Sequence, residues 1–206
     1  MTLLSRPSRP LARRARVARD DRLFVVATED TYAPHQYFSG FRIPRVQVHV
    51  VPTTDGKSAA SDVVERLKEL RDDAARRGDL QASDQFWVVV DTDHYVSGRH
   101  VKSFKSALKV ARSLQFNVAV SNPCFEIWLL LHVSSPPAEL KNARAVVDAL
   151  RNALGSYDKS NIDMEQYLPG VQDAVVRAKT LDVGLAGWPQ KMGTQVHLLV
   201  EEIMST

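Results

Sequence analysis

The sequence predicts an α/β fold with a mainly parallel, four-stranded sheet flanked by helices. Four short runs rich in β-branched and aromatic residues alternate with longer segments of helical periodicity, which is the pattern of a parallel sheet whose crossovers are helices. With 206 residues, of which 44% are hydrophobic and 25% charged, the chain has an ordinary globular composition and can bury a core. The predicted strands are residues 23–28, 45–51, 86–91 and 116–121.

The segment between the second and third strands has the clearest helical features. We expect a helix over about residues 61–77, with Asp62 as its N-cap, Glu65 completing a capping box, and Gly78 at its C-terminal end. Its apolar face comprises Val63, Leu67, Leu70 and Ala74.

The next crossover, residues 100–114, is also predicted to be a helix. It is basic on its outer side and carries Phe104, Leu108 and Ala111 toward the sheet. After Ser121 the strand signals fade, and the rest of the chain has helical character interrupted by prolines and glycines.

Composition divides the chain into an Arg-rich arm (residues 1–21), a core (22–133) and a C-terminal α-helical appendage (134–206). Residues 1–22 hold seven arginines and two aspartates and so carry +5, whereas the remainder of the chain carries −2. Two prolines and little apolar periodicity predict a flexible arm. Its guanidinium groups suit phosphate, although a solubilising tail is the alternative. The candidate nucleic-acid ligands in the arm are Arg13, Arg14 and Arg16.

The apolar stretches bear on the cellular compartment that we expect, and the single cysteine bears on the chemistry that a thiol could carry. The longest apolar stretch, Ile127–Leu131, is far shorter than the ~20 residues that cross a bilayer, and no signal-peptide pattern is present. We therefore expect a cytoplasmic protein that does not enter the membrane. Cys124 cannot form an internal disulfide, and its apolar neighbours favour a small buried side chain over a nucleophile.

Three acidic residues follow two of the predicted strands directly. Asp91 and Asp93 come after the apolar run 86–90, and Glu29 follows the run 23–27. Ligands of open α/β sheets gather at the carboxyl ends of the strands, so these carboxylates are candidate ligands for Mg²⁺ or Mn²⁺. An isolated D-x-D is equally consistent with a solvated turn.

The segment 121–132, SNPCFEIWLLLH, is the most distinctive in the chain. We expect Ser121 or Asn122 to cap a helix that begins near Pro123, which would place Asn122 and Glu126 one helical turn apart at the ligand edge of the sheet. Among apolar neighbours, Glu126 requires a cation, a donor or a proton. A catalytic or metal-related role and a buried hydrogen bond that pins the helix to the sheet are both open.

This segment resembles the RloB family, also called AbiL-like, of phage-defence proteins with a Toprim-type catalytic core. The resemblance covers about residues 23–204. Further matching motifs are Thr28-Glu29-Asp30, Tyr37-Phe38, Trp87 to Asp93, Tyr157-Asp158-Lys159, Ala178-Lys179 and Thr194 to Val200.

The resemblance implies a metal-dependent nuclease that hydrolyses phosphodiester bonds of DNA or RNA, tRNA among them, as the effector of a phage-defence system. In that reading Asp91 and Asp93 hold Mg²⁺ or Mn²⁺, and Glu29 is a ligand or a general acid/base, with Glu126 as a fourth catalytic candidate. Lys159 and Lys179 are candidate phosphate clamps. The implied partners are nucleic acid and an SMC-like or ABC-like ATPase encoded nearby.

The chain departs from the family pattern in the turn after the first strand. Asp30 stands where the family has glycine, and Ala33-Pro34-His35 replaces Thr-Glu-Pro, so one carboxylate is missing. The alternative function is therefore a catalytically weakened Toprim-like module that binds nucleic acid or the partner ATPase. A D-x-D sugar-nucleotide transferase is disfavoured, because P-loop and dinucleotide fingerprints are absent from the sequence. The sequence indicates neither the choice of DNA or RNA nor the trigger or the oligomeric state.

Overall fold

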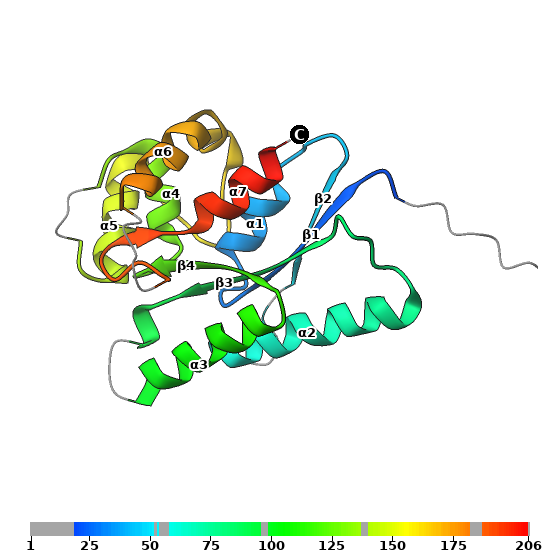
Figure 1. Ribbon diagram of the computed structural model, residues 1–206. Coiled ribbons are helices and arrows are strands. Elements are labelled where there is room, and N and C mark those ends of the chain that lie inside the picture. Colours follow the sequence, from blue (N-terminus) through cyan, green and yellow to red (C-terminus); the bar gives the residue numbers. More distant parts are fainter. Residues whose placement is uncertain are drawn as a thin grey trace, which may run out of the picture.

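The computed structural model describes residues 19–51, 53, 58–95, 99–136, 140–181 and 187–205, and in them a five-stranded sheet has the order β2-β1-β3-β4-β5 (Figure 1). Four strands run parallel, and the short fifth strand pairs antiparallel with β4. Their bounds are β1 (Arg22–Thr28), β2 (Val46–Val51), β3 (Gln85–Asp91), β4 (Asn117–Asn122) and β5 (Gly193–Thr194). The α/β class and the four predicted strands are thus confirmed.

The expected strand number of four is wrong by one, because β5 comes from the segment that we expected to be entirely helical. It has only two residues, too few to show the alternation that reveals a strand in sequence. Side-chain and backbone contacts fix its position: Ser121 Oγ and Thr194 Oγ1 are 2.9 Å apart, and Gln195 N donates to Val120 O at 2.9 Å.

Helices cover both faces of the sheet. The α-helices are α1 (Ala33–Ser39), α2 (Ala60–Arg77), α3 (Arg99–Ser113), α4 (Glu126–Val133), α5 (Ala143–Leu154), α6 (Val171–Leu181) and α7 (Val196–Met204). Three short 3-10 helices are η1 (Asp93–Tyr95), η2 (Met164–Gln166) and η3 (Leu168–Gly170). None of the helices in these described segments is both long and apolar enough to cross a membrane.

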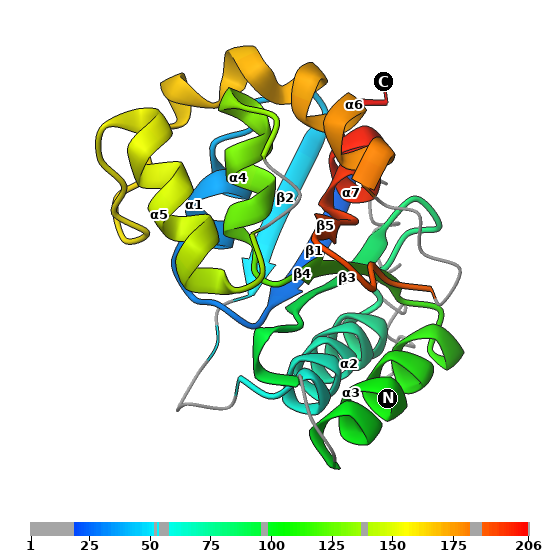
Figure 2. The same cartoon turned by 90° about the vertical axis from the view of Figure 1, so that its left-hand side faces the viewer.

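One face of the sheet is covered by α2 and α3, which lie side by side (Figures 1 and 2). Their apolar residues share one hydrophobic cluster with the strands, and Leu67 and Leu108 are fully buried in it. The predicted inward face of the basic crossover is confirmed, because Phe104 and Ala111 are buried as well.

The other face carries α1, α4 and α7, with α5 and α6 packed farther out (Figure 2). Helix α4 is buried from Glu126 to His132. A helix with apolar side chains around most of its circumference is stable when other elements cover it on all sides. The hydrophobic cluster on this face joins residues of β1 and α1 to residues of α5, α6 and α7, so the helices after residue 133 pack directly against the core.

The start of α2 differs from the expected capping box. The N-cap is Ala59, without a side-chain hydrogen bond, and Asp62 lies in the first turn, where its charge favours the helix dipole. Because the helix begins at Ala60, Asp62 is its third residue and not its N-cap. The predicted end is confirmed, because Gly78 adopts the left-handed conformation at φ 70°.

Candidate functional site

A pocket of about 450 Å³ opens at the carboxyl ends of the parallel strands. It brings together all four predicted carboxylates, which come from three separate segments of the chain. The lining residues are Glu29, Asp30, Thr31, Tyr32, Thr53, Ser58, Asp91, Asp93, Cys124, Glu126, Ala143, Val147 and Lys159. We call this the acid pocket.

Glu29 and Asp91 lie next to each other because β1 and β3 are neighbouring parallel strands. Their register pairs Thr28 with Val89, and the Glu29 backbone N–H donates to Val89 O at 3.2 Å. The Glu29 carboxylate then accepts a hydrogen bond from the Asp91 backbone N–H at 3.2 Å. Adjacent strand ends therefore position these two acids, as the sequence led us to expect.

The turn that carries Asp93 is attached to the neighbouring strand end rather than being a free solvated loop. The backbone N–H groups of Thr92 and Asp93 both donate to Pro123 O, at 3.1 and 3.0 Å, and Thr92 N is also 3.0 Å from Ser121 O. These bonds fix the D-x-D against β4 and so hold Asp93 at the pocket.

The segment after β4 differs from the expected geometry. Helix α4 begins at Glu126 with Phe125 as N-cap, not near Pro123, because β4 continues through Asn122. The Asn122 side chain donates to Pro189 O at 3.0 Å and caps no helix. Asn122 and Glu126 are therefore not one helical turn apart.

Burial and nearby negative charge raise the pKa values of Glu29 and Asp91. The pKa of Glu29 rises to about 7, first through burial and then through the charges of Asp93 and Asp30, against the backbone hydrogen bond from Asp91. The pKa of Asp91 lies well above its usual range through burial, followed by repulsion from Glu29, Glu126 and Asp93. A bound cation would favour the charged forms of both.

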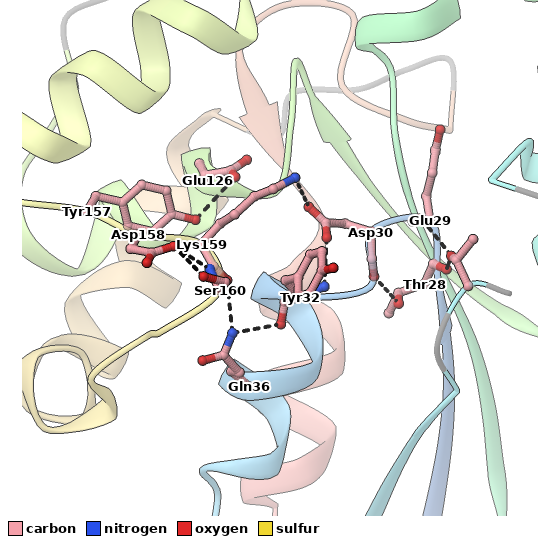
Figure 3. A network of polar contacts seen from close by, with 11 residues as sticks. Thr28, Glu29, Asp30, Tyr32, Gln36, Glu126, Tyr157, Asp158, Lys159 and Ser160 are labelled. Atoms are coloured by element: carbon pink, nitrogen blue, oxygen red, sulfur yellow. Dashed lines mark hydrogen bonds and ion pairs between the residues drawn. The ribbon is translucent and has the colours of Figure 1, made fainter. Parts of the chain in front are cut away.

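Glu126 is buried, with 7% of its surface exposed, and has a specific hydrogen-bond donor. The Tyr157 hydroxyl donates to Glu126 Oε1 at 3.2 Å (Figure 3). Burial, followed by the Glu126 charge, raises the pKa of the Tyr157 hydroxyl, so it stays protonated and available as a donor. This bond joins α4 to the segment after α5 and is not the helix-to-sheet bond that we considered.

Lys159 lies at the pocket in an ion pair with Asp30. Its Nζ is 3.3 Å from Asp30 Oδ2 and 5.9 Å from the centre of the Tyr32 ring (Figure 3). Gln36 holds this segment to α1, because its side chain donates to Lys159 O at 2.9 Å and accepts from Ile162 N at 2.8 Å. The other Asp30 oxygen accepts from Tyr32 N at 2.7 Å.

The remaining candidates lie away from the pocket or have other partners. Lys179 lies on α6, pairs with Glu201 of α7 and does not line the pocket. His132 is a core residue, with Nδ1 donating to Trp128 O at 2.8 Å and Nε2 accepting from the Tyr37 hydroxyl at 3.0 Å. Cys124 is buried, and burial raises the pKa of its thiol. Arg13, Arg14 and Arg16 lie outside the described residues.

Sequence reasoning missed two residues that shape the pocket. The Thr53 hydroxyl donates to Glu29 O at 2.7 Å, and Tyr157 hydrogen-bonds to Glu126. Thr53 could have been found as a polar residue just beyond the end of the strand beside β1. The sequence pointed to Tyr157 only as part of the motif Tyr157-Asp158-Lys159. Its bond to Glu126 joins residues that are far apart in sequence.

The carboxylate oxygens of the acid pocket suit a hard divalent cation whose coordination shell is completed by substrate. Within the described part of the chain, no group of three or more His, Cys, Asp or Glu side chains is arranged to hold a metal ion. Mg²⁺, however, is commonly bound by one or two carboxylates together with water and substrate phosphates. The oxygen donors of Glu29, Asp91 and Asp93, with the raised pKa values of Glu29 and Asp91, fit that mode of binding.

A family model described as "RloB-like protein" matches residues 24–203, which run from β1 into α7. The match includes every candidate site residue outside the Arg-rich arm. Comparison with curated proteins found no match, and comparison with solved structures found none.

Proposed function

The chain belongs to the RloB-like family, and from that premise we propose that it is a metal-dependent nuclease with a Toprim-like core. It hydrolyses phosphodiester bonds of DNA or RNA, with tRNA among the candidate substrates, as the effector of a phage-defence system. An SMC-like or ABC-like ATPase is its proposed partner. The observation that carries the proposal is the convergence of Glu29, Asp91, Asp93 and Glu126 on one pocket at the carboxyl edge of the sheet.

Each pocket residue has a role in this proposal. Glu29, Asp91 and Asp93 would hold Mg²⁺ or Mn²⁺, which when bound polarises a phosphoryl oxygen and lowers the pKa of a water molecule. If Glu29 is not a metal ligand, it is the general acid/base of the reaction, and its pKa of about 7 in the metal-free protein suits proton transfer near neutral pH. Lys159 neutralises phosphate charge once the substrate displaces it from Asp30, and Tyr157 orients Glu126.

One observation supports the weakened binding module as a second candidate. The turn after β1 lacks the carboxylate of the family pattern, and the Asp30 carboxylate is bonded to Lys159 and to the Tyr32 backbone. Asp30 lines the acid pocket with its carboxylate engaged by these two groups, which supports a weakened site. In this second proposal the pocket binds the phosphate backbone or the ATPase without cleaving a bond.

Phage protection in cells that carry the intact operon separates the two candidates. We expect Glu29→Gln and Asp91→Asn each to abolish protection and the appearance of new tRNA or DNA ends, at unchanged protein level. Glu65→Gln is the matched control, because it removes an exposed carboxylate of α2 that pairs with Lys68. Full protection by Glu29→Gln would overturn the nuclease and favour the binding module.

A further inference from the structure

The charged residues on the exposed side of α3 are all basic. The helix contains five lysine and arginine residues and no acidic one, and the side chains of the last four are exposed. These four are spaced by three, four and three residues, so they form one line about 15 Å long at 1.5 Å per residue. We call Lys102, Lys105, Lys109 and Arg112 the basic stripe.

No acid of the described chain neutralises the basic stripe. None of its four residues forms an ion pair with a residue that the structure describes. Lys105 Nζ lies 5.6 Å from the centre of the Trp188 ring, and Arg112 donates to Gly187 O at 2.8 Å. Like charges three or four residues apart destabilise a helix by about 0.2–0.5 kcal/mol per pair. A polyanionic ligand bound along the stripe would relieve this repulsion.

The basic stripe starts at the end of the molecule where the acid pocket opens. Helix α3 follows η1, whose first residue is Asp93, and the rings of Tyr95 and Phe104 pack at 4.6 Å between centres. In Figure 1 the N-terminal end of α3 lies at the carboxyl end of β3, and the helix runs back along the sheet. A nucleic acid held at the pocket can therefore continue along α3.

We infer that the basic stripe binds the phosphate backbone of a nucleic-acid duplex that is presented to the acid pocket, an inference that rests on the proposed nuclease function. Proteins that grip single strands stack bases on exposed aromatic side chains, whereas Phe104 of α3 is buried and the Trp188 ring beside the stripe packs against Phe104 and Lys105. The exposed Ser103 and Ser106 lie beside the lysines and can donate to phosphate oxygens. At 3.4 Å per base pair, the stripe spans about four to five base pairs.

Binding of the full chain to fluorescein-labelled duplexes of about 20 base pairs, followed by anisotropy over a salt series, tests the inference. One arm uses a DNA duplex and the other an RNA duplex of the same sequence, which identifies the source of the phosphate backbone. EDTA is present throughout, so cleavage plays no part. The test variant combines Lys102→Gln, Lys105→Gln and Lys109→Gln. The matched control combines Lys68→Gln, Arg76→Gln and Arg77→Gln on α2, which also removes three positive charges.

We expect the α3 variant to bind at least tenfold more weakly at 0.1 M salt, with a salt slope shallower by about 2–3, since each lost phosphate contact removes about 0.9. The control should keep the wild-type affinity, and replacing the same three lysines by arginine should preserve binding. Equal loss in the α3 variant and the control, or no loss in the α3 variant, would overturn the inference. Because cleavage is not measured, an inactive pocket leaves this result unaffected, so the two proposals fail separately.

Discussion

Helices α2 and α3 cover the same face of the sheet, yet their exposed sides differ in charge. Helix α2 has five acidic and five basic residues and forms ion pairs along its length, such as Lys68 with Glu65 at 3.0 Å. Helix α3 has five lysine and arginine residues and no acid. Both nevertheless bury an apolar face in one cluster, with Leu67 and Leu108 fully buried. Packing thus determines where both helices lie, and the exposed charge remains available for a ligand.

The acid pocket, like the exposed side of α3, gathers side chains of one charge. In the pocket these side chains are acidic and largely buried. Water and salt screen the repulsion among the exposed lysines of α3. The buried Glu29 and Asp91 instead have raised pKa values, because burial and neighbouring acids penalise their charged forms. The two clusters of like charge are therefore the two places where we expect a ligand to stabilise the protein most.

The largest expected effect concerns the packing of α2 and α3 into their shared core. Leu67→Ala and Leu108→Ala should each lower the free energy of unfolding by about 3 kcal/mol, because both side chains fill the same core. Urea unfolding followed by circular dichroism measures this, with Val110→Ala, at an exposed position of α3, as the control. A loss below about 1 kcal/mol for Leu108→Ala alone would show that packing does not hold α3 as it holds α2.

The next effect concerns the buried charge of Glu29 in metal-free protein. Its folded pKa of about 7 exceeds the ordinary value of 4.5, so the folded state binds more protons between these pH values. Stability should therefore fall as pH rises from about 4.5 through 7. Glu29→Gln removes this loss and should be more stable than wild type at pH 8 by roughly 3 kcal/mol, but not at pH 4.

Urea unfolding in EDTA at the two pH values measures this difference. Glu65→Gln is the control, because that carboxylate is exposed and its substitution breaks only a surface ion pair. It should change stability by less than about 1 kcal/mol at pH 8. A Glu29→Gln protein with the same small difference from wild type at both pH values would contradict the buried, raised-pKa carboxylate.

The smallest expected effect concerns the different charge patterns on the exposed sides of α2 and α3. Lys109→Glu places an acid between Lys105 and Arg112 and should raise the free energy of unfolding by about 0.5 kcal/mol. Asp72→Lys on α2 should lower it by a similar amount, because it replaces the ion pair with Arg71 by repulsion and adds a like charge one helical turn from two other cations. Both changes should shrink in 1 M salt. Stabilisation by both substitutions would mean that the charge patterns of the two helices are equivalent.

The sequence predicted those parts of the fold that depend on long periodic patterns. The strands β1 to β4, with the helices α2 and α3, were found from apolar runs and helical spacing. What it missed depends on short or long-range features. The two residues of β5 show no pattern, and the start of α4 was misplaced because Ser121 pairs with a strand that the sequence did not reveal.

The site was predictable where strand ends positioned it. Glu29, Asp91 and Asp93 follow neighbouring parallel strands, so their meeting follows from topology. Partners from distant segments were not predictable: Tyr157 reaches Glu126, and Lys159 pairs with Asp30, through the fold of the C-terminal region. Lys179 carried the same sequence signal as Lys159, but α6 places it beside Glu201.

Titration calorimetry with Mn²⁺ tests the central claim, that the acid pocket is a divalent-metal site, most directly. Wild-type protein should release or absorb heat on weak, saturable binding, because few protein carboxylates hold the ion before substrate phosphates complete its shell. The Asp91→Asn/Asp93→Asn variant should give only the heat of dilution while keeping the wild-type circular dichroism spectrum. Equal binding heats in the two proteins would place any bound metal elsewhere and contradict the account.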